Sequence, residues 1–336
     1  MSAEAPEPIL QIKDLHVRFP VQRNMLGRVT VENHAVSGVD LDLRPGETLG
    51  LVGESGCGKT TLGRTIVGAQ QATSGSILYD GHDLTQLKNR EKGRYRRQIR
   101  MVFQDPFSSL NPRMTLRQII GDPLVATGEA RGAELEDRVA DMMRRVGLSP
   151  DYMDRYPHAF SGGQRQRVNI ARALIVNPKL VVADEPVSAL DVSVRAQILN
   201  LLRELQADFG LTYLFISHDL SVVENIADRV AVMYFGRVVE LADTASLYEK
   251  PSHPYTEALM SAVPIPDPAL RGRGGRILLP DELPDPANPP PGCAFARRCR
   301  HAEPGRCDTG TVDLVDGTRC VRRDELDLQG IVKAES

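Results

Sequence analysis

The apolar positions along the chain first predict strands. Apolar and polar residues alternate over Ile9–Pro20 and again over Val36–Leu43, which predicts two half-buried strands. Three apolar runs of strand length follow at 48–52, 180–183 and 213–216. The second of these runs is unbroken, as in a parallel strand that is buried on both faces. These runs together predict a β-rich start followed by a central parallel sheet.

A helical period dominates the stretch between residues 115 and 157. Apolar residues recur there at spacings of three and four, and they include Leu116, Ile119, Ile120, Val139, Met142, Met143 and Val146. Because strands lie before and after this stretch, we expect a helical insert within an α/β domain. Further helices are expected after residue 60 and over 194–209.

The segment between the run at 48–52 and the helix after it carries a phosphate-binding pattern. Its sequence is Gly53-Glu54-Ser55-Gly56-Cys57-Gly58-Lys59-Thr60. Glycines let successive backbone N–H groups turn toward an anion, and the start of a helix adds partial positive charge. In such a loop Lys59 reaches the β- and γ-phosphates and Thr60 ligates Mg²⁺. The chain is therefore predicted to bind a nucleoside triphosphate.

Polar residues that follow the later strands are candidates for the same binding site as this loop. Asp184 and Glu185 follow the run at 180–183, and His218 follows the run at 213–216. Carboxylates at the carboxyl ends of parallel strands lie where α/β sheets bind their ligands. In isolation, however, the two carboxylates fit a helix cap and His218 fits a hydrogen-bonded residue at a strand end. Their function therefore depends on the other motifs.

A second anion site is predicted upstream of these carboxylates, at Ser161-Gly162-Gly163-Gln164. Ser161 is a suitable N-cap for the helix that follows, and the two glycines expose the first N–H groups of that helix.

Composition and charge narrow the class of protein. The 336 residues have a formal net charge of −3, which does not suggest a nucleic-acid binder, whose surface is normally basic. The basic run at 88–100 is more typical of a solvated helix face than of a binding site. The chain has no apolar run of the ~18 residues that cross a bilayer, and its first eight residues lack a signal-peptide pattern. We therefore expect a cytoplasmic protein.

The complete set of motifs resembles the ATP-binding cassette (ABC) family over residues 9–250. The family's Walker A, Q-loop, signature, Walker B, D-loop and switch-histidine motifs correspond, in that order, to Gly53–Thr60, Gln104, Ser161–Gln164, Leu180–Asp184, Ser188–Asp191 and His218. The resemblance implies an α/β ABC nucleotide-binding domain over 9–250. This domain would have a P-loop core with a parallel sheet, a β-rich N-terminal subdomain and a helical insert at about 106–175.

The resemblance also implies a mechanism. Two cassettes close head to tail around two ATP molecules, and each ATP is held by the Walker A loop of one subunit and the signature of the other. Glu185 would polarise the attacking water, and His218 would contact the γ-phosphate. Mg²⁺ would be held, directly or through water, by Thr60, Gln104 and Asp184. The implied nucleotide contacts are Phe19, Ser55, Gly56, Cys57, Gly58, Lys59, Thr60, Thr61, Gln104, Asp184, Ser161, Gly162, Gly163, Gln164 and Asp191.

Among the implied nucleotide contacts, Phe19 and Cys57 carry further expectations. Phe19 would stack on adenine, and packing in the core is the alternative. Cys57 lies at the start of a helix, a setting that lowers the pKa of a thiol. We therefore expect alkylation of Cys57 to block ATP binding.

A closer resemblance is to the ATP-binding subunits of bacterial dipeptide and oligopeptide importers. It rests on the sequences at 53–59, 102–113, 156–161 and 253–256. That family pairs two non-identical cassettes, and the Cys57 form of the loop is similar to the F-type member. The resemblance implies that ATP hydrolysis energises import of peptides, although some relatives carry nickel or glycosides.

Partners follow from the same resemblance. They are a second, homologous ABC ATPase subunit of the D-type, two transmembrane permease subunits and, indirectly, an extracytoplasmic peptide-binding protein, with no nucleic acid. The chain would lie peripherally on the cytoplasmic face of the plasma (inner) membrane. The alternative is a soluble ABC ATPase acting on nucleic acid or ribosomes. A single phosphate loop, and the lack of sustained heptads between Lys59 and Ser161, disfavour that alternative.

A proline-rich extension, residues 251–336, carries four of the five cysteines, which are Cys293, Cys299, Cys307 and Cys320. The cytosol keeps thiols reduced, so four cysteines there are more consistent with metal ligands than with disulfides. Their spacing fits structural zinc or an iron–sulfur cluster, and unliganded thiols are the remaining alternative. The resemblance to peptide importers, carried by residues 292–299, favours a [4Fe–4S] cluster over Zn²⁺.

Overall fold

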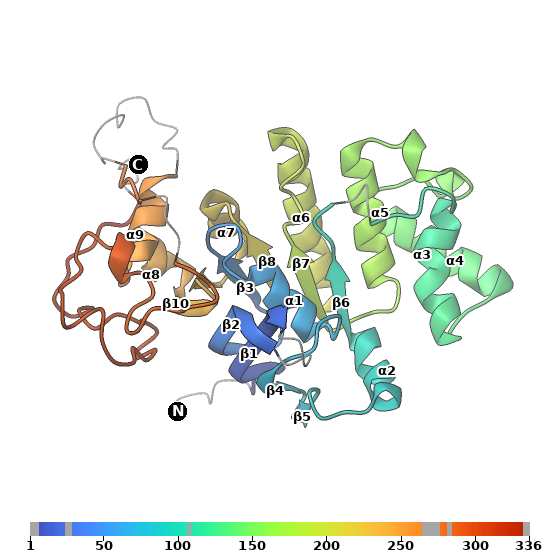
Figure 1. The fold of residues 1–336 in the computed structure, drawn as a ribbon. Helices are drawn as coiled ribbons and strands as arrows, with labels where there is room; N and C mark the ends of the chain where they lie inside the picture. Colours follow the sequence, from blue (N-terminus) through green and yellow to red (C-terminus); the bar gives the residue numbers. More distant parts are fainter. Residues whose placement is uncertain (1–6, 24–28, 106–108, 264–275, 281–283, 332–336) are drawn as a thin grey trace, which may run out of the picture.

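The structure is a computed structural model of the chain. It describes residues 7–23, 29–105, 109–263, 276–280 and 284–331. Within these ranges the chain forms two sheets, a group of helices beside them and a largely irregular C-terminal extension (Figure 1).

The larger sheet is the predicted parallel sheet. Its strand order is β10-β9-β3-β8-β7-β6, and all neighbouring pairs are parallel except β10 and β9. The bounds of these strands are Thr48–Val52 (β3), Ile99–Val102 (β6), Leu180–Asp184 (β7), Thr212–Ser217 (β8), Arg229–Tyr234 (β9) and Arg237–Asp243 (β10). Every residue of β3, β7 and β8 is buried, which confirms the interpretation of these runs as central strands.

The smaller sheet is antiparallel and holds the β-rich start of the chain. Its order is β2-β1-β4-β5, with bounds Leu10–Arg23 (β1), Val29–Leu43 (β2), Ser74–Tyr79 (β4) and His82–Asp83 (β5). The second strand begins at residue 29 and not at 36 as the alternation predicted. Pairing with β1 extends it, because Val31 and Val29 lie opposite Gln22 and Arg23.

One helix lies between the two sheets, and several of the others pack on the larger sheet. Helix α1 contacts β2, β7 and β8. The helices are Lys59–Ile66 (α1), Asn89–Gln98 (α2), Leu116–Thr127 (α3), Gly132–Arg145 (α4), Gly162–Leu174 (α5), Val192–Phe209 (α6), Leu220–Ile226 (α7), Thr244–Glu249 (α8) and Pro254–Ser261 (α9), with short 3₁₀ turns at Pro150–Tyr152 (η1), Pro157–Ala159 (η2) and Ala296–Arg298 (η4).

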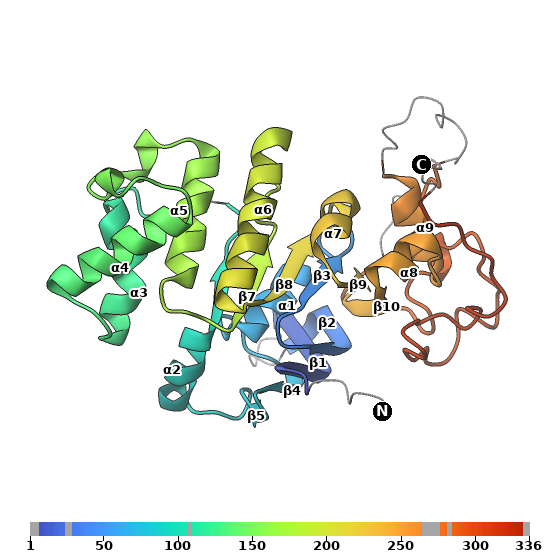
Figure 2. The ribbon, with the colours of Figure 1, turned by 180° about the vertical axis from the view of Figure 1, so that it is seen from behind.

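Helices α3, α4 and α5 form the predicted helical insert. They pack on one another through a core that includes Leu116, Ile120, Val139 and Val168. Both ribbon views show this insert at one end of the molecule and the C-terminal extension at the other (Figures 1 and 2). Residues 106–108, at the expected start of the insert, lie outside the described residues.

The C-terminal extension packs against the last strand of the larger sheet. Leu241 donates its backbone N–H to Gly317 O at 2.7 Å, and Arg319 donates to Val239 O at 2.8 Å. The predicted boundary between 250 and 251 falls between α8 and α9. Part of the proline-rich segment, residues 264–275 and 281–283, lies outside the described residues.

Candidate functional site: the phosphate loop and the strand ends beside it

The phosphate loop connects β3 to α1, as the sequence predicted. Gly58 is the N-cap of α1 and has φ +107°, and Gly53 has φ +152°. A Cβ atom at Gly53 would lie 2.1 Å from Met233 O, and one at Gly58 would lie 2.2 Å from Ala35 O. Glycine is therefore required at both positions, because any side chain would collide with neighbouring backbone.

Lys59 is buried and its ammonium group lies over this loop. Its Nζ donates to Gly53 O at 2.7 Å and to Glu54 O at 2.9 Å, and only 5% of the residue is exposed. A cation held beside the first N–H groups of a helix, which have no partner within the helix, makes a strong phosphate site.

The acidic strand end lies directly against the loop. Thr60 Oγ1 donates to Asp184 Oδ1 at 3.1 Å, so the hydroxyl and the carboxylate predicted to hold Mg²⁺ are adjacent. Burial raises the pKa of Asp184. Hydroxyl and carboxylate oxygens are ligands that Mg²⁺ prefers, and this donor set fits the ion.

Glu185, which follows the Walker B strand, contacts the Q-loop glutamine and the switch histidine. Gln104 Nε2 donates to Glu185 Oε2 at 2.8 Å, and His218 Nδ1 lies 3.1 Å from Glu185 Oε1. The backbone of Glu185 has φ +46°, a left-handed conformation that is uncommon for a glutamate and that often occurs at functional sites. The carboxylate is thus fixed between the Q-loop and the switch histidine.

A cavity of about 420 Å³ opens beside these groups. Phe19, Gln104 and Glu185 line it together with Ser55, Gly56, Gly58, Lys59, Thr60 and Thr61 of the loop and α1. The sequence did not indicate the other lining residues, which are Asn33, His34, Ala35, Phe235, Gly236 and Pro286. No motif marked these positions, because they meet the loop only through the packing of β2, the β9–β10 turn and the extension.

The signature lies apart from this cavity. Ser161 caps α5, and its Oγ accepts from Gln164 N, as the sequence predicted. None of the four signature residues, Ser161, Gly162, Gly163 and Gln164, lines the cavity of Lys59, and neither does Asp191, the N-cap of α6. One chain therefore brings together the Walker A, Q-loop and Walker B residues but not the signature.

Two family profiles and several known proteins match the sequence of this chain. The ABC transporter family profile matches residues 36–188, and the profile of the oligopeptide/dipeptide transporter C-terminal region matches residues 239–307. The oligopeptide transport ATP-binding protein AppF of Bacillus subtilis is 52% identical over 90% of this chain and 93% of its own. The corresponding OppF of Escherichia coli is 51% identical over 90% and 91%. The chain belongs to the ABC transporter family.

Solved structures share the fold of this ABC ATPase. The cassette MJ0796, in a dimeric post-hydrolysis state bound to ADP and Pi, covers 70% of the chain and 98% of its own length with a TM-score of 0.61 and 28% identity. CbiO1 of Clostridium perfringens, part of the ABC transporter complex cbiONQ, gives a TM-score of 0.62 at 29% identity, over 72% of this chain and 90% of its own. The ABC nucleotide-binding fold predicted from the sequence is therefore confirmed.

The thiol of Cys57 in the phosphate loop differs from the sequence prediction in the direction of its pKa. The thiol is buried, with 7% of the residue exposed, and burial raises its pKa instead of lowering it. The helix start and Lys59 Nζ, 3.7 Å from the sulfur, favour the thiolate, but desolvation is the larger effect. The predicted direction of the pKa of Cys57 was therefore wrong, and the effect of its alkylation on ATP binding stays a prediction.

The four cysteines of the extension meet at one place. Cys293, Cys299, Cys307 and Cys320 line the same narrow pocket, and burial raises the pKa of Cys293 and of Cys299 to about 11. Within the described ranges, no group of three or more His, Cys, Asp or Glu side chains is placed so that it could hold a metal ion. The expected zinc or iron–sulfur site is therefore not confirmed.

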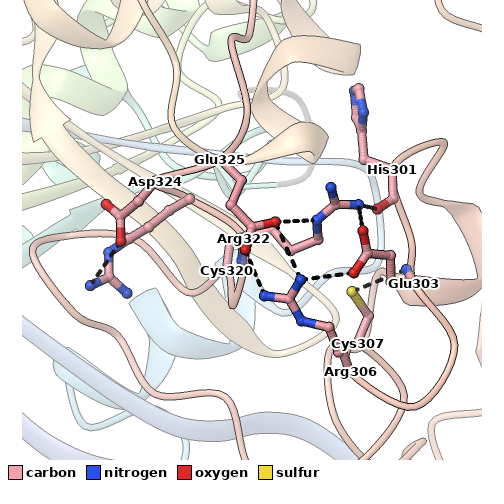
Figure 3. A network of polar contacts seen from close by, with 9 residues as sticks. His301, Glu303, Arg306, Cys307, Cys320, Arg322, Asp324 and Glu325 are labelled. Atoms are coloured by element: carbon pink, nitrogen blue, oxygen red, sulfur yellow. Dashed lines mark hydrogen bonds and ion pairs between the residues drawn. The ribbon is translucent and has the colours of Figure 1, made fainter.

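A ring of ion pairs connects the two segments that carry Cys307 and Cys320 (Figure 3). Arg306 and Arg322 each contact both Glu303 and Glu325, at distances of 2.7–2.9 Å. Hydrogen bonds from these arginines lower the pKa of Glu325 to about 2. Backbone N–H groups of Glu303 and Arg322 donate to the sulfurs of Cys307 and Cys320, each at 3.4 Å.

Across the described parts of the chain, we find no helix whose length and apolar character would let it cross a membrane.

Proposed function

We propose that this ABC ATPase energises the import of peptides through a membrane transporter. The observation that carries the proposal is the presence of both an ABC cassette and the oligopeptide/dipeptide transporter C-terminal region on one chain. Relatives named for oligopeptide transport match about nine tenths of the chain at 51–52% identity. A glutathione import protein, GsiA of Pectobacterium atrosepticum, is 54% identical over 83% of this chain and 45% of its own.

The geometry supports the predicted roles in hydrolysis. Lys59 and the loop N–H groups would bind the phosphates, and Phe19 would pack against the adenine from its place on the cavity wall. Thr60, Asp184 and Gln104 would hold Mg²⁺, which when bound neutralises phosphate charge. Glu185, whose carboxylate contacts Gln104 and His218, would orient and polarise the attacking water, and His218 would contact the γ-phosphate.

A second cassette would complete the ATP site. The signature residues Ser161–Gln164 and Asp191 lie outside the cavity, so they are available to a nucleotide that is bound to another subunit. The second subunit would be a homologous D-type cassette. The pair would associate with two permease subunits on the cytoplasmic face of the plasma membrane, and an extracytoplasmic binding protein would deliver the peptide.

The transport proposal is tested by isolating the complete complex from the membrane. The chain, purified through a tag, is expected to bring with it two permeases and a second ATPase. Reconstituted in vesicles with its binding protein, the complex should take up labelled peptides in an ATP-dependent manner. A complex that retains ATP hydrolysis but transports no peptide from a set of two to six residues would overturn the peptide assignment and leave the ATPase assignment intact.

We further propose that the four cysteines of the extension hold a [4Fe–4S] cluster. They line one pocket, and two of their sulfurs already accept backbone N–H groups, an interaction that tunes such clusters. The resemblance of residues 292–299 to the tail of peptide-importer subunits favours a cluster over Zn²⁺. The cluster would be ligated by Cys293, Cys299, Cys307 and Cys320.

Anaerobic purification tests the cluster. The protein is expected to contain iron and acid-labile sulfide and to absorb broadly in the visible range. Cys299→Ser should lose this absorption, whereas Cys57→Ser, which changes a buried cysteine outside the pocket, should keep it. Protein without iron and sulfide, or with stoichiometric zinc, would contradict the assignment.

A further inference from the structure

The cysteine region of the extension contacts the phosphate loop through one arginine. Arg298 lies in η4, between Cys293 and Cys299, and forms a bidentate ion pair with Glu54 of the loop. Its Nη1 donates to Glu54 Oε2 at 2.8 Å and its Nη2 donates to Glu54 Oε1 at 3.1 Å. Only 6% of the arginine side chain and 30% of the glutamate side chain are exposed. A partly buried, bidentate pair of this kind is more specific in geometry than an exposed pair and is screened less by salt.

Arg298 is itself held in place by the extension and by the sheet. Its Nε donates to Pro280 O at 2.8 Å, and its guanidinium lies 5.8 Å from the centre of the Tyr234 ring at the end of β9. Phe295 packs edge-on against Tyr234 with ring centroids 5.3 Å apart. The position of the guanidinium therefore depends on the folded extension.

The backbone of Glu54 is fixed by a second residue beyond the cassette. Glu54 donates its N–H to Tyr255 Oη of α9 at 2.9 Å. The ring of Tyr255 packs on both Phe295 and Tyr234, so the same aromatic cluster supports both contacts. The extension thus holds the side chain and the N–H group of a single loop residue.

Glu54 passes this constraint to the lysine that binds phosphate. Its carbonyl oxygen accepts from Lys59 Nζ at 2.9 Å, which makes a continuous chain of contacts from Arg298 to Glu54 to Lys59. Glu54 is also the acidic residue of the loop, and an unpaired carboxylate there would repel the phosphates of ATP. Arg298 offsets this charge as well as fixing the loop.

We propose that Arg298 is a positioning residue of the ATP site, through which the cysteine-containing extension holds Glu54 and sets the affinity of the phosphate loop for ATP. The proposal rests on the assignment of the loop as the ATP site. It predicts that loss of Arg298 weakens nucleotide binding chiefly because Glu54 is left unpaired, so that removal of the Glu54 charge restores binding.

The test measures affinity for a fluorescent ATP analogue on the purified full chain, and KM and kcat on the assembled complex. Arg298→Gln is expected to raise the dissociation constant and KM about tenfold while kcat changes less than about twofold. The double variant Arg298→Gln/Glu54→Gln should recover most of the affinity. A variant that only loosened the extension would not be rescued by a change in the loop.

Arg300→Gln is the matched control. Arg300 lies two residues further along, and its Nη2 donates to the buried Glu257 Oε1 at 2.9 Å, an ion pair that does not reach the loop. The affinity of the Arg300→Gln variant for the ATP analogue should equal that of the unchanged protein. Arg298→Lys keeps the charge without the bidentate geometry and should give an intermediate affinity for the ATP analogue. If Arg298→Gln fails to melt cooperatively, Arg298→Lys is used in its place.

The outcomes separate this proposal from the ATP-site assignment. Normal affinity in a folded Arg298 variant, or no recovery in the double variant, would overturn the positioning role. Normal affinity in Lys59→Ala would show instead that ATP binds elsewhere, which would contradict the proposed function itself.

Discussion

Glu185→Gln is expected to bind ATP with near-normal affinity and to hydrolyse it about 10²- to 10⁴-fold more slowly. The amide keeps the size of the side chain and can still contact Gln104 and His218, but it cannot accept a proton from the attacking water. Because Glu185 lies between these two side chains and does not hold the phosphates, binding and turnover should separate. Release of phosphate by the assembled complex, together with nucleotide binding, measures the two effects.

Glu204→Gln is the matched control for this experiment, because it makes the same chemical change at an exposed residue of α6. It should leave turnover unchanged. Near-normal hydrolysis by Glu185→Gln would show that another group activates the water.

Lys59→Ala is expected to weaken ATP binding about 10- to 100-fold, because hydrogen bonds to charged groups contribute about 1.5–3 kcal/mol. The lysine lies over the loop with its ammonium group on Gly53 O and Glu54 O, where the phosphates would enter. Titration with a fluorescent ATP analogue gives the affinity, and a thermal melt of the same sample reports whether the variant is folded.

Lys179→Ala controls for the loss of one positive charge, since Lys179 is exposed and lies on the segment before β7. The affinity of the Lys179→Ala variant for the ATP analogue should be unchanged. If Lys59→Ala and Lys179→Ala bound ATP equally well, the phosphate loop would not be the nucleotide site.

Local sequence rules predicted the elements that carry the motifs. The apolar run at 48–52 forms β3, and Ser161 caps α5 with a side-chain hydrogen bond. Such features depend on neighbouring residues alone, because a cap needs a hydroxyl next to free N–H groups and a buried strand needs an unbroken apolar run.

Features that depend on distant partners were missed. Strand β9 was not predicted, although its pairing with β3 places it inside the larger sheet. The first half of β2 is a strand because β1 lies beside it. The pKa of Cys57 was predicted in the wrong direction, because a helix start is visible in the sequence whereas the burial of one thiol is not.

Local motifs were sufficient to predict the nucleotide chemistry of this ABC ATPase. A phosphate cradle needs consecutive glycines, a lysine and a hydroxyl at fixed spacing, and these are local requirements. The folded chain was needed to find that Arg298 pairs with Glu54, 244 residues earlier, and that Tyr255 accepts the N–H of the same residue, 201 residues earlier. These contacts depend on the packing of Tyr234, Tyr255 and Phe295 against one another, and no short sequence pattern predicts that packing.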